Sequence, residues 1–497
     1  MLPSDNQSMP THPLPMTTTL ADTMPDRALC VSKREHLLGA IALLVMALSV
    51  PRLQGAEADG PVPAFVGGDR VCFIGDSITH SGYYSDDVLL FYATRFPKAC
   101  LEIFNCGISG DTALGAVRRF EGDIAVHRPT VATIMLGMND VRRDLYDETR
   151  NSPQDREQQR RALELHGAKM EELAGKLDAL GCRIIFLTPS IYDQTAKLPE
   201  KNYLGTNDAL AACAELDRAL ASRHNGSVVD FNGQMARINA EAQVKDPSFT
   251  ITSSDRVHPG EPGHLVMTYL MLKTQGLPGT VAAVVVDAAS GNWSGERCTL
   301  SNVVTDGSSV SFDCLAESLP FPVGSRAVPA LALVPFMSEL NREPVTITGL
   351  DPGRYELLID GQPVLEASAD ELSRGVDLAG NERTPQYRQA HRAKAIRDRR
   401  HDVISGRLRT IRAVEHFMIS LAKDLNPDDQ AAIDAIIGER LERARQEKRT
   451  YEAGQLETYQ QWHPRLAELE SEVAEATDAL WKTCQPKVHH YTIRPKT

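Results

Sequence analysis

The sequence has no excess of positive charge. Its 497 residues contain 53 Lys and Arg against 66 Asp and Glu, which gives a formal net charge of -13. A surface with this balance repels the phosphate backbone of nucleic acids and an anionic lipid surface. We therefore expect no nucleic-acid partner.

The chain also lacks, beyond residue 57, any apolar run of the roughly 20 residues that cross a bilayer. A shorter apolar run, residues 37–50, follows Lys33 and Arg34 and precedes Pro51. This order is typical of a secretory signal. We assign residues 1–57 to an N-terminal extension with a signal peptide and expect export to the periplasm or the cell exterior. If the run stays uncleaved it anchors the protein in a membrane, and a helix packed at the edge of a domain is the remaining alternative.

Cysteine is sparse and lacks the spacing of a metal site. The nine cysteines include no CxxC pair and no Cys/His set with zinc spacing, so we expect no metal of that kind. Cys72, Cys106 and Cys182 lie in or beside apolar segments and are predicted to be buried thiols. Cys298 and Cys314 flank a turn-rich segment, so they are either partners in a disulfide across a hairpin or two free thiols.

A regular alternation of apolar runs and amphipathic segments fills residues 71–275. The short runs VCFIG, LEIFN, VATIML, RIIFLT and SVVDF are separated by longer stretches with helical periodicity. Such alternation predicts a parallel β-sheet with helices on both faces. In open sheets of this kind, ligands bind at the carboxyl ends of the strands.

Two regions of different character follow. Residues 281–370 contain short β-type runs bounded by Gly, Pro, Asp and Ser, and predict a small, mostly antiparallel β-rich region. Residues 383–482 are charged and have helical periodicity, which predicts a helical hairpin or bundle. Asn426 and Pro427 are predicted to start the second helix of that region. A homodimer is one expectation from a heptad-like pattern in the last segment: Leu466, Leu469, Val473, Ala476 and Leu480.

The first predicted strand ends in the tripeptide Gly-Asp-Ser, which places Ser77 at a strand-to-helix junction. A serine there can present its hydroxyl at the edge of the sheet, next to a helix N-terminus that stabilises an oxyanion. Taken alone, Ser77 could equally cap the helix. The loop lacks both the GK[ST] ending and the GxGxxG spacing, so a phosphate-binding loop is not predicted.

Glycine and asparagine follow the next two strands. Gly110 has no side chain, so its backbone N–H can lie against a developing oxyanion, and Gly107 is the second candidate for this donor. Asn139 follows the third strand and can donate its side-chain amide to the same oxygen. Asp111 is expected to be structural and to cap the helix that begins near Thr112.

Asp255 and His258 lie far downstream, in the sequence Ser-Asp-Arg-Val-His-Pro-Gly. The two-residue gap lets one loop present both an imidazole and a carboxylate that accepts the ring N–H. The order serine, aspartate, histidine is workable for a triad on a parallel α/β sheet. We therefore predict Ser77 as nucleophile, His258 as general base and Asp255 as its carboxylate partner.

Together these segments resemble the SGNH/GDSL hydrolase family over about residues 71–272. The resemblance implies a flavodoxin-like three-layer α/β/α domain, which we expect over residues 67–276, and hydrolysis of carboxylic esters without metal or organic cofactor. It implies a Ser-His-Asp triad and an oxyanion hole made by the backbone N–H groups of the serine and a glycine with an asparagine amide. The matching residues in this chain are Ser77, Gly110, Asn139, Asp255 and His258.

The resemblance leaves the ester substrate open, either a small molecule or a polysaccharide. Expected export favours carbohydrate deacetylation, and so do Tyr83 and Tyr84, which either form a sugar-stacking wall or pack the first helix. Lipase-like, lysophospholipase-like and arylesterase activities are the alternatives. His80 lies near Ser77 in sequence but lacks a paired carboxylate, so we expect it only to line the pocket.

The sequence gives less support to two other kinds of protein, a metal-dependent enzyme and a non-enzymatic binding protein. A metal-dependent phosphoesterase would use Asp76, Asn139, Asp255 and His258 as ligands, but the sequence lacks the D-x-H and H-x-H patterns that dinuclear sites need. A non-enzymatic protein would use residues 281–497 as a wall-binding or protein-binding module beside an inactive hydrolase. The complete set of predicted site residues argues against that hypothesis.

Overall fold

The computed structural model describes residues 62–419 and 429–496. The predicted signal peptide, residues 1–57, lies outside the described residues, and so do Asn426 and Pro427. Across the two described ranges, no helix is both long enough and apolar enough to cross a membrane.

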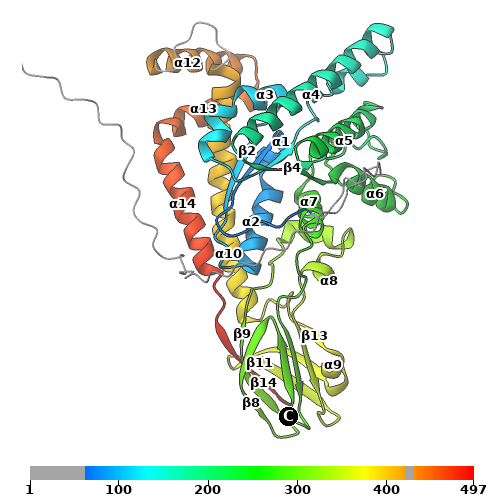
Figure 1. The fold of residues 1–497 in the computed structure, drawn as a ribbon, viewed down its shortest axis with the longest axis vertical. Helices are drawn as coiled ribbons and strands as arrows, with labels where there is room; N and C mark the ends of the chain where they lie inside the picture. The colour runs from blue at the N-terminus through cyan, green and yellow to red at the C-terminus, as the bar shows by residue number, and fades with distance from the viewer. Residues whose placement is uncertain (1–61, 420–428, 497) are drawn as a thin grey trace, which may run out of the picture. The chain divides into compact units, whose positions relative to one another are not determined.

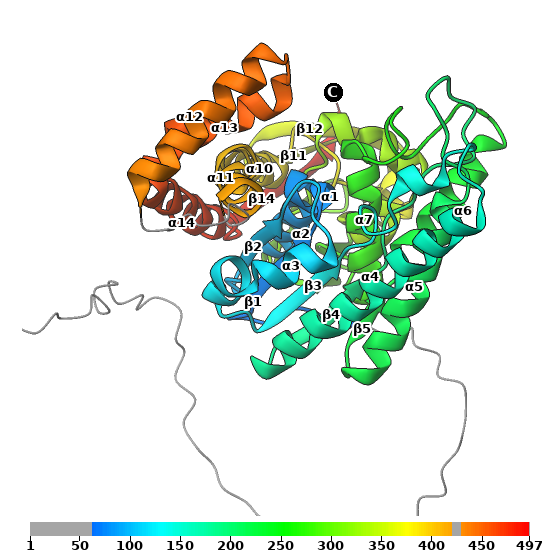
Figure 2. The same ribbon diagram turned by 90° about the horizontal axis from the view of Figure 1, so that it is seen from above.

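A five-stranded parallel sheet forms the centre of the hydrolase region, with strand order β2-β1-β3-β4-β5 (Figure 2). The five apolar runs of the sequence become these strands, as predicted. After β2 the chain crosses to the other side of β1, so the direction of winding reverses between β1 and β3. Ligands bind at such a switch point. The strands are β1 (Arg70–Gly75), β2 (Glu102–Gly107), β3 (Val131–Met135), β4 (Arg183–Leu187) and β5 (Ser227–Val229).

Successive residues of the strands point to opposite faces of the sheet and enter two separate cores. In β1, Val71 and Phe73 join the core under one layer of helices, and Cys72 and Ile74 join the core under the other. This alternation confirms the predicted three-layer α/β/α fold. The first layer contains α2 (Tyr83–Arg95), α6 (Phe231–Gln243) and α7 (Glu261–Thr274). The second contains α3 (Ala113–Arg118), α4 (Pro153–Ala179) and α5 (Thr206–Arg223).

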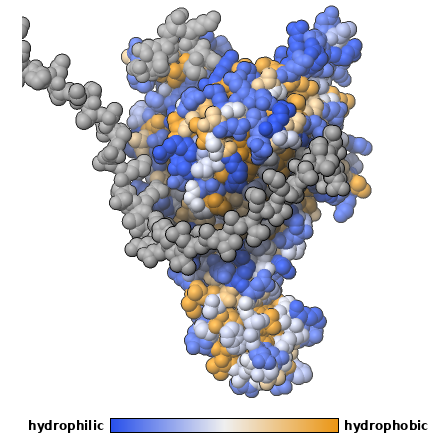
Figure 3. Space-filling model, viewed as in Figure 1, coloured by the Kyte–Doolittle hydropathy of each residue, from blue (hydrophilic) through white to orange (hydrophobic). Residues whose placement is uncertain are grey.

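Helix α4 shows how local sequence sets an element's ends. The Ser152 hydroxyl accepts the Asp155 backbone N–H at 3.1 Å, the Asp155 carboxylate accepts the Ser152 N–H at 3.1 Å, and Pro153 takes the first helical position. Gly181, at a φ of +68°, follows the last turn of the helix. Hydrophilic side chains cover the N-terminal half of α4, at the upper right of Figure 3.

Two sheets make up the β-rich region, and the larger one includes a strand that the sequence analysis did not anticipate. This strand, β14 (Val488–Pro495), lies between β9 and β11 and pairs antiparallel with both (Figure 1). The larger sheet also contains β8 (Cys298–Thr305), β9 (Val310–Ala316), β11 (Arg354–Ile359) and β12 (Gln362–Ser368). The smaller sheet contains β6 (Ala283–Asp287), β7 (Trp293–Glu296), β10 (Pro344–Thr348) and β13 (Val376–Asp377).

Cys298 and Cys314 lie on paired strands as free thiols, so the disulfide alternative is wrong. The two strands pair in a register in which Cys314 faces Leu300 and Cys298 faces Ala316. The two thiols are nonetheless neighbours, because a hydrogen bond joins their side chains. Cys72, Cys106 and Cys182 are buried thiols, as predicted.

Short helices link the β-rich region to the hydrolase core. They are η4 (Ser325–Ala332) and α8 (Phe336–Leu340), whereas α9 (Ala369–Arg374) packs inside the β-rich region. The segment around η4 and α8 contributes Phe321, Phe336 and Leu340 to the core that also contains α2 and α7. Phe321 lies against Phe91 of α2, with 6.1 Å between ring centroids. The β-rich region is thus joined to the hydrolase core by shared packing.

Residues 385–419 form one long helical segment that lies beside α2 in both Figure 1 and Figure 2. It comprises α10 (Pro385–Val403), a widened π-type turn at Ile404–Leu408, α11 (Arg409–Val414) and a second such turn at Glu415–Ile419. Thr384 caps it: the Thr384 side chain accepts the Tyr387 backbone N–H.

Three more helices follow, α12 (Gln430–Gln446), α13 (Thr450–Trp462) and α14 (Leu466–Thr483). Helix α12 begins at Gln430 with Asp429 as its cap. The heptad-like side chains of α14 are used within the chain: Leu469 packs with α12 and α13, and Leu480 packs into the hydrolase core. A homodimer stays a prediction.

The place of β14 in the larger sheet gives a test. Tyr491 is 3% exposed and stacks on Phe312 of β9 with 4.9 Å between ring centroids. Tyr491→Ala is expected to lower the free energy of unfolding of the β-rich region by about 3 kcal/mol, because it leaves a cavity in the sheet's core. Urea denaturation measures the loss. Val488→Ala, at a 58% exposed position of the same strand, is the control and should change stability by less than about 0.5 kcal/mol. Equal effects of the two variants would contradict this account.

Candidate active site

Ser77 is the first residue of the short helix α1 (Ser77–Ser81), one residue after the end of β1. Asp76 caps this helix, because its side chain accepts the Ile78 backbone N–H at 3.0 Å. The alternative role of Ser77 as the cap is therefore wrong, and its hydroxyl is free to face the carboxyl edge of the sheet. Burial raises the pKa of Asp76 to about 7.

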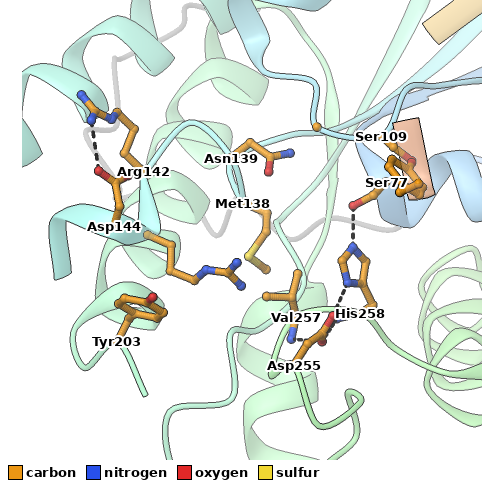
Figure 4. Close-up of a pocket in the computed structure, with 13 residues that line it drawn as sticks. Ser77, Ser109, Met138, Asn139, Arg142, Asp144, Tyr203, Asp255, Val257 and His258 are labelled. Carbon is orange, nitrogen blue, oxygen red and sulfur yellow. Dashed lines mark hydrogen bonds and ion pairs between the residues drawn. The ribbon is translucent and has the colours of Figure 1, made fainter. Parts of the chain in front are cut away.

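Ser77, His258 and Asp255 form a line of hydrogen bonds (Figure 4). The Ser77 Oγ lies 2.8 Å from His258 Nε2, and His258 Nδ1 lies 2.5 Å from Asp255 Oδ2. With Nδ1 carrying the proton that Asp255 accepts, Nε2 can accept the proton of the serine hydroxyl. The arrangement suits proton transfer from serine to imidazole.

The Asp255 carboxylate is held ionised by its surroundings. Partial burial opposes the charge, but hydrogen bonds from the His258 side chain, backbone N–H groups and the Ser253 hydroxyl together keep the pKa of Asp255 well below its usual range. The Val257 and His258 backbone N–H groups donate to Oδ1 at 2.9 and 3.0 Å, and Ser253 Oγ donates at 2.7 Å. One loop thus fixes both the charge and the orientation of the carboxylate.

Arg256 anchors this loop from inside the protein, a role that the sequence analysis missed. It is 2% exposed and lies between Asp255 and Val257 with a φ of +68°. Its guanidinium donates to four backbone carbonyls at 2.9–3.2 Å, those of Asp193, Ala196, Leu198 and Glu200. The inward side chain of Arg256 turns its neighbours toward the pocket.

Gly110 and Asn139 line the same pocket as Ser77, a cavity of roughly 700 Å³. Gly110 has a φ of +85°, where glycine is favoured over other residues. The Asn139 side-chain amide donates to the Asp111 carbonyl at 2.8 Å, which orients it beside the loop that carries Gly110. Figure 4 shows Asn139 and Ser77 on neighbouring parts of the pocket wall.

Gly107 is not available as the alternative oxyanion donor. Its backbone N–H donates to Asn105 Oδ1 at 2.9 Å, and a Cβ at this position would lie 2.2 Å from the backbone nitrogen of His80. Gly107 is therefore required for close packing.

Asp111 is structural, as expected, but Thr112 is the residue that caps α3, because its hydroxyl accepts the Gly115 N–H at 3.2 Å.

His80 does not line the pocket, so that expectation is wrong. It is 8% exposed, and its Nδ1 accepts the Ser109 backbone N–H at 3.1 Å. Its Nε2 therefore carries the proton and donates to the Ser405 carbonyl at 3.1 Å. Burial and the nearby Arg409 charge lower the pKa of His80 to about 4, so the ring is neutral at physiological pH. Position alone, three residues after Ser77, did not reveal this inward orientation.

The aromatic wall of the pocket comes from residues that the sequence analysis did not select. Tyr203 and Tyr451 line the cavity, and the Arg143 guanidinium lies 5.7 Å from the centroid of the Tyr203 ring. Tyr83 and Tyr84 do not contribute: Tyr84 is fully buried with its hydroxyl 3.0 Å from Thr79 Oγ1, and Tyr83 packs on a histidine of α10. The first helix is packed, and the sugar-stacking wall predicted there is wrong.

The residues proposed as metal ligands are already engaged in other interactions. Asp76 is the buried cap of α1, and the Asp255 carboxylate already accepts hydrogen bonds from the backbone N–H groups of Val257 and His258. Within residues 62–419 and 429–496, no group of three or more His, Cys, Asp or Glu side chains is arranged to hold a metal ion. The geometry gives no support to the phosphoesterase hypothesis.

Comparison with known proteins yields one family and several relatives. The model of the GDSL-like lipase/acylhydrolase family matches residues 73–266. An acetylxylan esterase from Geobacillus stearothermophilus is 27% identical over 225 residues, which are 42% of this chain and 94% of that protein.

One solved structure extends the similarity beyond the hydrolase region. A gut microbial diltiazem-metabolizing enzyme is 31% identical with a TM-score of 0.81, and the match covers 88% of this chain and all (100%) of that one. The crystal structure of an acetylxylan esterase from Geobacillus stearothermophilus is 25% identical over 43% of this chain and 96% of its own, with a TM-score of 0.35.

The buried Asp76 carboxyl predicts a pH-dependent stability. Its pKa is raised by folding, so the native state keeps a proton that the unfolded chain releases, and stability falls between about pH 4 and pH 7. Asp76→Asn removes this loss while keeping an oxygen that can accept the Ile78 N–H. The free energy of unfolding of the variant should exceed that of the wild type by roughly 1.4 kcal/mol more for each pH unit across that range. Urea denaturation of both proteins at pH 5 and pH 8 measures their free energies of unfolding. The same difference between variant and wild type at both pH values would refute the prediction.

Proposed function

This chain belongs to the SGNH/GDSL family of lipases and acylhydrolases and is an esterase, and we propose that it cleaves carboxylic esters through an acyl-enzyme on Ser77. The observation that carries the proposal is the hydrogen-bonded line from Ser77 through His258 to Asp255 at the edge of a pocket. Each member has the partner that its role requires.

The mechanism starts with transfer of the Ser77 proton to His258 Nε2 as Oγ attacks the ester carbonyl. The ionised Asp255 stabilises the imidazolium and keeps its ring oriented. The carbonyl oxygen becomes an oxyanion, which accepts hydrogen bonds from the Ser77 and Gly110 backbone N–H groups and the Asn139 amide. His258 then protonates the leaving alcohol. Water attacks the acyl-enzyme by the same route and releases the acid.

Asn139 can serve this role without giving up its present hydrogen bond. A side-chain amide has two N–H donors, and one of them donates to the Asp111 carbonyl at 2.8 Å. The second remains available to an oxyanion in the pocket. The Asp111 carbonyl therefore acts as the orienting partner of the amide, and the donor is in place before the charge develops.

The pocket favours a small acyl group on a polar alcohol. Among its thirteen lining residues, only Met138 and Val257 carry aliphatic or thioether side chains, so it offers little surface to a long fatty acyl chain. Tyr203 and Tyr451 supply aromatic faces with polar edges, which suit a sugar ring. We therefore propose deacetylation of carbohydrates. The similarity to an acetylxylan esterase supports this choice.

Two further considerations bear on the substrate. Export, which residues 37–50 predict, would bring the enzyme to acetylated polysaccharides outside the cytoplasm. A second candidate is hydrolysis of a small aromatic ester, favoured by the similarity to the diltiazem-metabolizing enzyme over 88% of this chain. Both candidates use the same chemistry and differ in the alcohol that leaves.

Ser77→Ala tests the nucleophile. The variant is expected to lower kcat on p-nitrophenyl acetate by about 10⁴-fold or more while the circular dichroism spectrum stays unchanged, because it loses the hydroxyl that forms the acyl-enzyme. Ser81→Ala is the matched control on the same helix, since the Ser81 hydroxyl donates to the Ile78 carbonyl. It should keep most of the activity. Turnover by Ser77→Ala near the wild-type rate would overturn the mechanism.

A substrate series tests the acyl and alcohol preferences. The specificity constant kcat/KM for p-nitrophenyl esters should be highest for acetate and fall at least about tenfold by the eight-carbon ester, because the pocket has few apolar contacts to offer. Acetylated xylo-oligosaccharides and diltiazem, assayed by released acetate, distinguish the two candidate alcohols. A preference for acyl chains of eight carbons or more would overturn carbohydrate deacetylation and favour a lipase.

A further inference from the structure

A helix from far along the chain packs against the back of the loop that carries Gly110. We call residues 107–111 the oxyanion loop and residues 385–419 the buttress helix. The family match ends at residue 266, so the buttress helix lies outside it. Three sets of contacts join the two segments, at the start, the middle and the end of the loop.

At the start of the loop, Arg409 uses all three of its nitrogen positions. Its Nε donates to the Gly107 carbonyl at 2.9 Å, and its two terminal nitrogens donate to the two oxygens of Asp123 at 2.7 Å each. Arg409 is 4% exposed, and Asp123 is 6% exposed. A bidentate, buried pair of this kind is rigid and directional. It fixes the Gly107 carbonyl relative to the hydrolase core.

The same ion network continues to the end of the loop. Asp123 also accepts from Arg119 at 2.5 Å, and Arg119 donates to Asp111 at 2.7 Å. The Asp111 carbonyl is the acceptor that orients Asn139. A chain of alternating charges therefore runs from the buttress helix to Asp111, whose backbone carbonyl orients the Asn139 donor.

In the middle of the loop, the contact passes through His80. The Ser109 backbone N–H donates to His80 Nδ1 at 3.1 Å, and His80 Nε2 donates to the Ser405 carbonyl at 3.1 Å. The Ser405 hydroxyl donates back to the His80 carbonyl at 2.9 Å. Ser405 lies in the widened turn Ile404–Leu408, and such turns often mark functional positions in helices.

The last turn of the buttress helix comes close to Gly110 itself. A Cβ placed on Gly110 would lie 3.9 Å from Phe417 Cζ, and His416 Nε2 lies 3.5 Å from Asp111 Oδ1. The buttress helix therefore covers the side of the oxyanion loop that faces away from the pocket.

We propose that the buttress helix holds the oxyanion loop in its donor conformation and that Arg409 is a positioning residue for the Gly110 and Asn139 donors. The proposal rests on the proposed function, because it assigns Arg409 to the transition state of ester hydrolysis. Hydrogen-bond donors stabilise an oxyanion best when they are fixed before the charge forms. A loop released from Arg409 would have to be reordered in each reaction cycle.

The test compares two lysine substitutions on one helix. Arg409→Lys keeps the charge but loses the planar fork that reaches both Gly107 and Asp123. Arg397→Lys is the matched control: Arg397 is also 4% exposed and pairs at 2.9 Å with Asp87 of α2, away from the loop. We expect Arg409→Lys to lower kcat on p-nitrophenyl acetate about 10- to 100-fold with KM within about twofold. Arg397→Lys should keep kcat within about twofold.

Hydrogen–deuterium exchange supplies a readout that does not need ester turnover. Peptides that contain residues 105–112 should exchange faster in Arg409→Lys and at the wild-type rate in Arg397→Lys. Unchanged exchange there in Arg409→Lys overturns the proposal, and so does faster exchange with an unchanged kcat. If Ser77→Ala proves active, the proposed function fails, and the exchange data still decide whether Arg409 holds the loop.

Ser405→Ala is the second variant, for use if Arg409→Lys does not fold. It removes only the hydroxyl that donates to the His80 carbonyl, at a partly exposed position. The expected result is a smaller change in the same direction: faster exchange of residues 105–112 and a kcat about two- to fivefold lower, with KM unchanged. Wild-type exchange and wild-type kcat in this variant would overturn the proposal.

Discussion

Asp123 carries a buried negative charge that two guanidinium groups share. Arg119 belongs to the hydrolase region, whereas Arg409 lies 286 residues beyond Asp123 in the chain. Transfer of a carboxylate out of water costs several kcal/mol unless opposite charges and hydrogen bonds compensate it. Neither the hydrolase region nor residues 385–419 can bury these groups favourably without the other. The docking of residues 385–419 on the hydrolase region depends on this mutual compensation.

The same interaction connects stability to chemistry. Arg119 and Arg409 touch the segment that carries Gly110, and Asn139 is oriented through the Asp111 carbonyl. Parallel strands bring such loops to one edge of the sheet, but strand geometry alone does not immobilise them. Buried charge pairs supply that rigidity, because their geometry is directional and their separation is costly.

Much of the hydrolase fold could be predicted from sequence because its signals are local. Each of the five central strands is a short apolar run between amphipathic helices, and burial on both faces produces that pattern. β14 could not be predicted in its place, because pairing between β9 and β11 is a long-range choice that its own residues do not encode. The docking of residues 385–419 was missed for the same reason, since its arginines resemble an ordinary charged helix face.

In the candidate site, too, residues with local sequence signals could be predicted, and residues brought in by long-range contacts could not. Asp255 and His258 share one loop, and Ser77 lies one residue after a strand, so these sequence signals taken together were enough to select the three residues. Tyr203 and Tyr451 are brought to the pocket by loops and helices far apart in the chain. Tyr84 was misplaced because α2 is buried on nearly all sides, between α7 and α10, and leaves no face for a pocket wall.

The position of β14 also bears on the order in which the molecule matures. β14 fills the space between β9 and β11, yet the helices α10 to α14 separate it from both in the order of synthesis. While the nascent chain lengthens, the facing edges of β9 and β11 exist without the strand that later joins them. Open strand edges are templates for pairing with other chains. We therefore expect the β-rich region to be prone to aggregation until β14 enters the sheet.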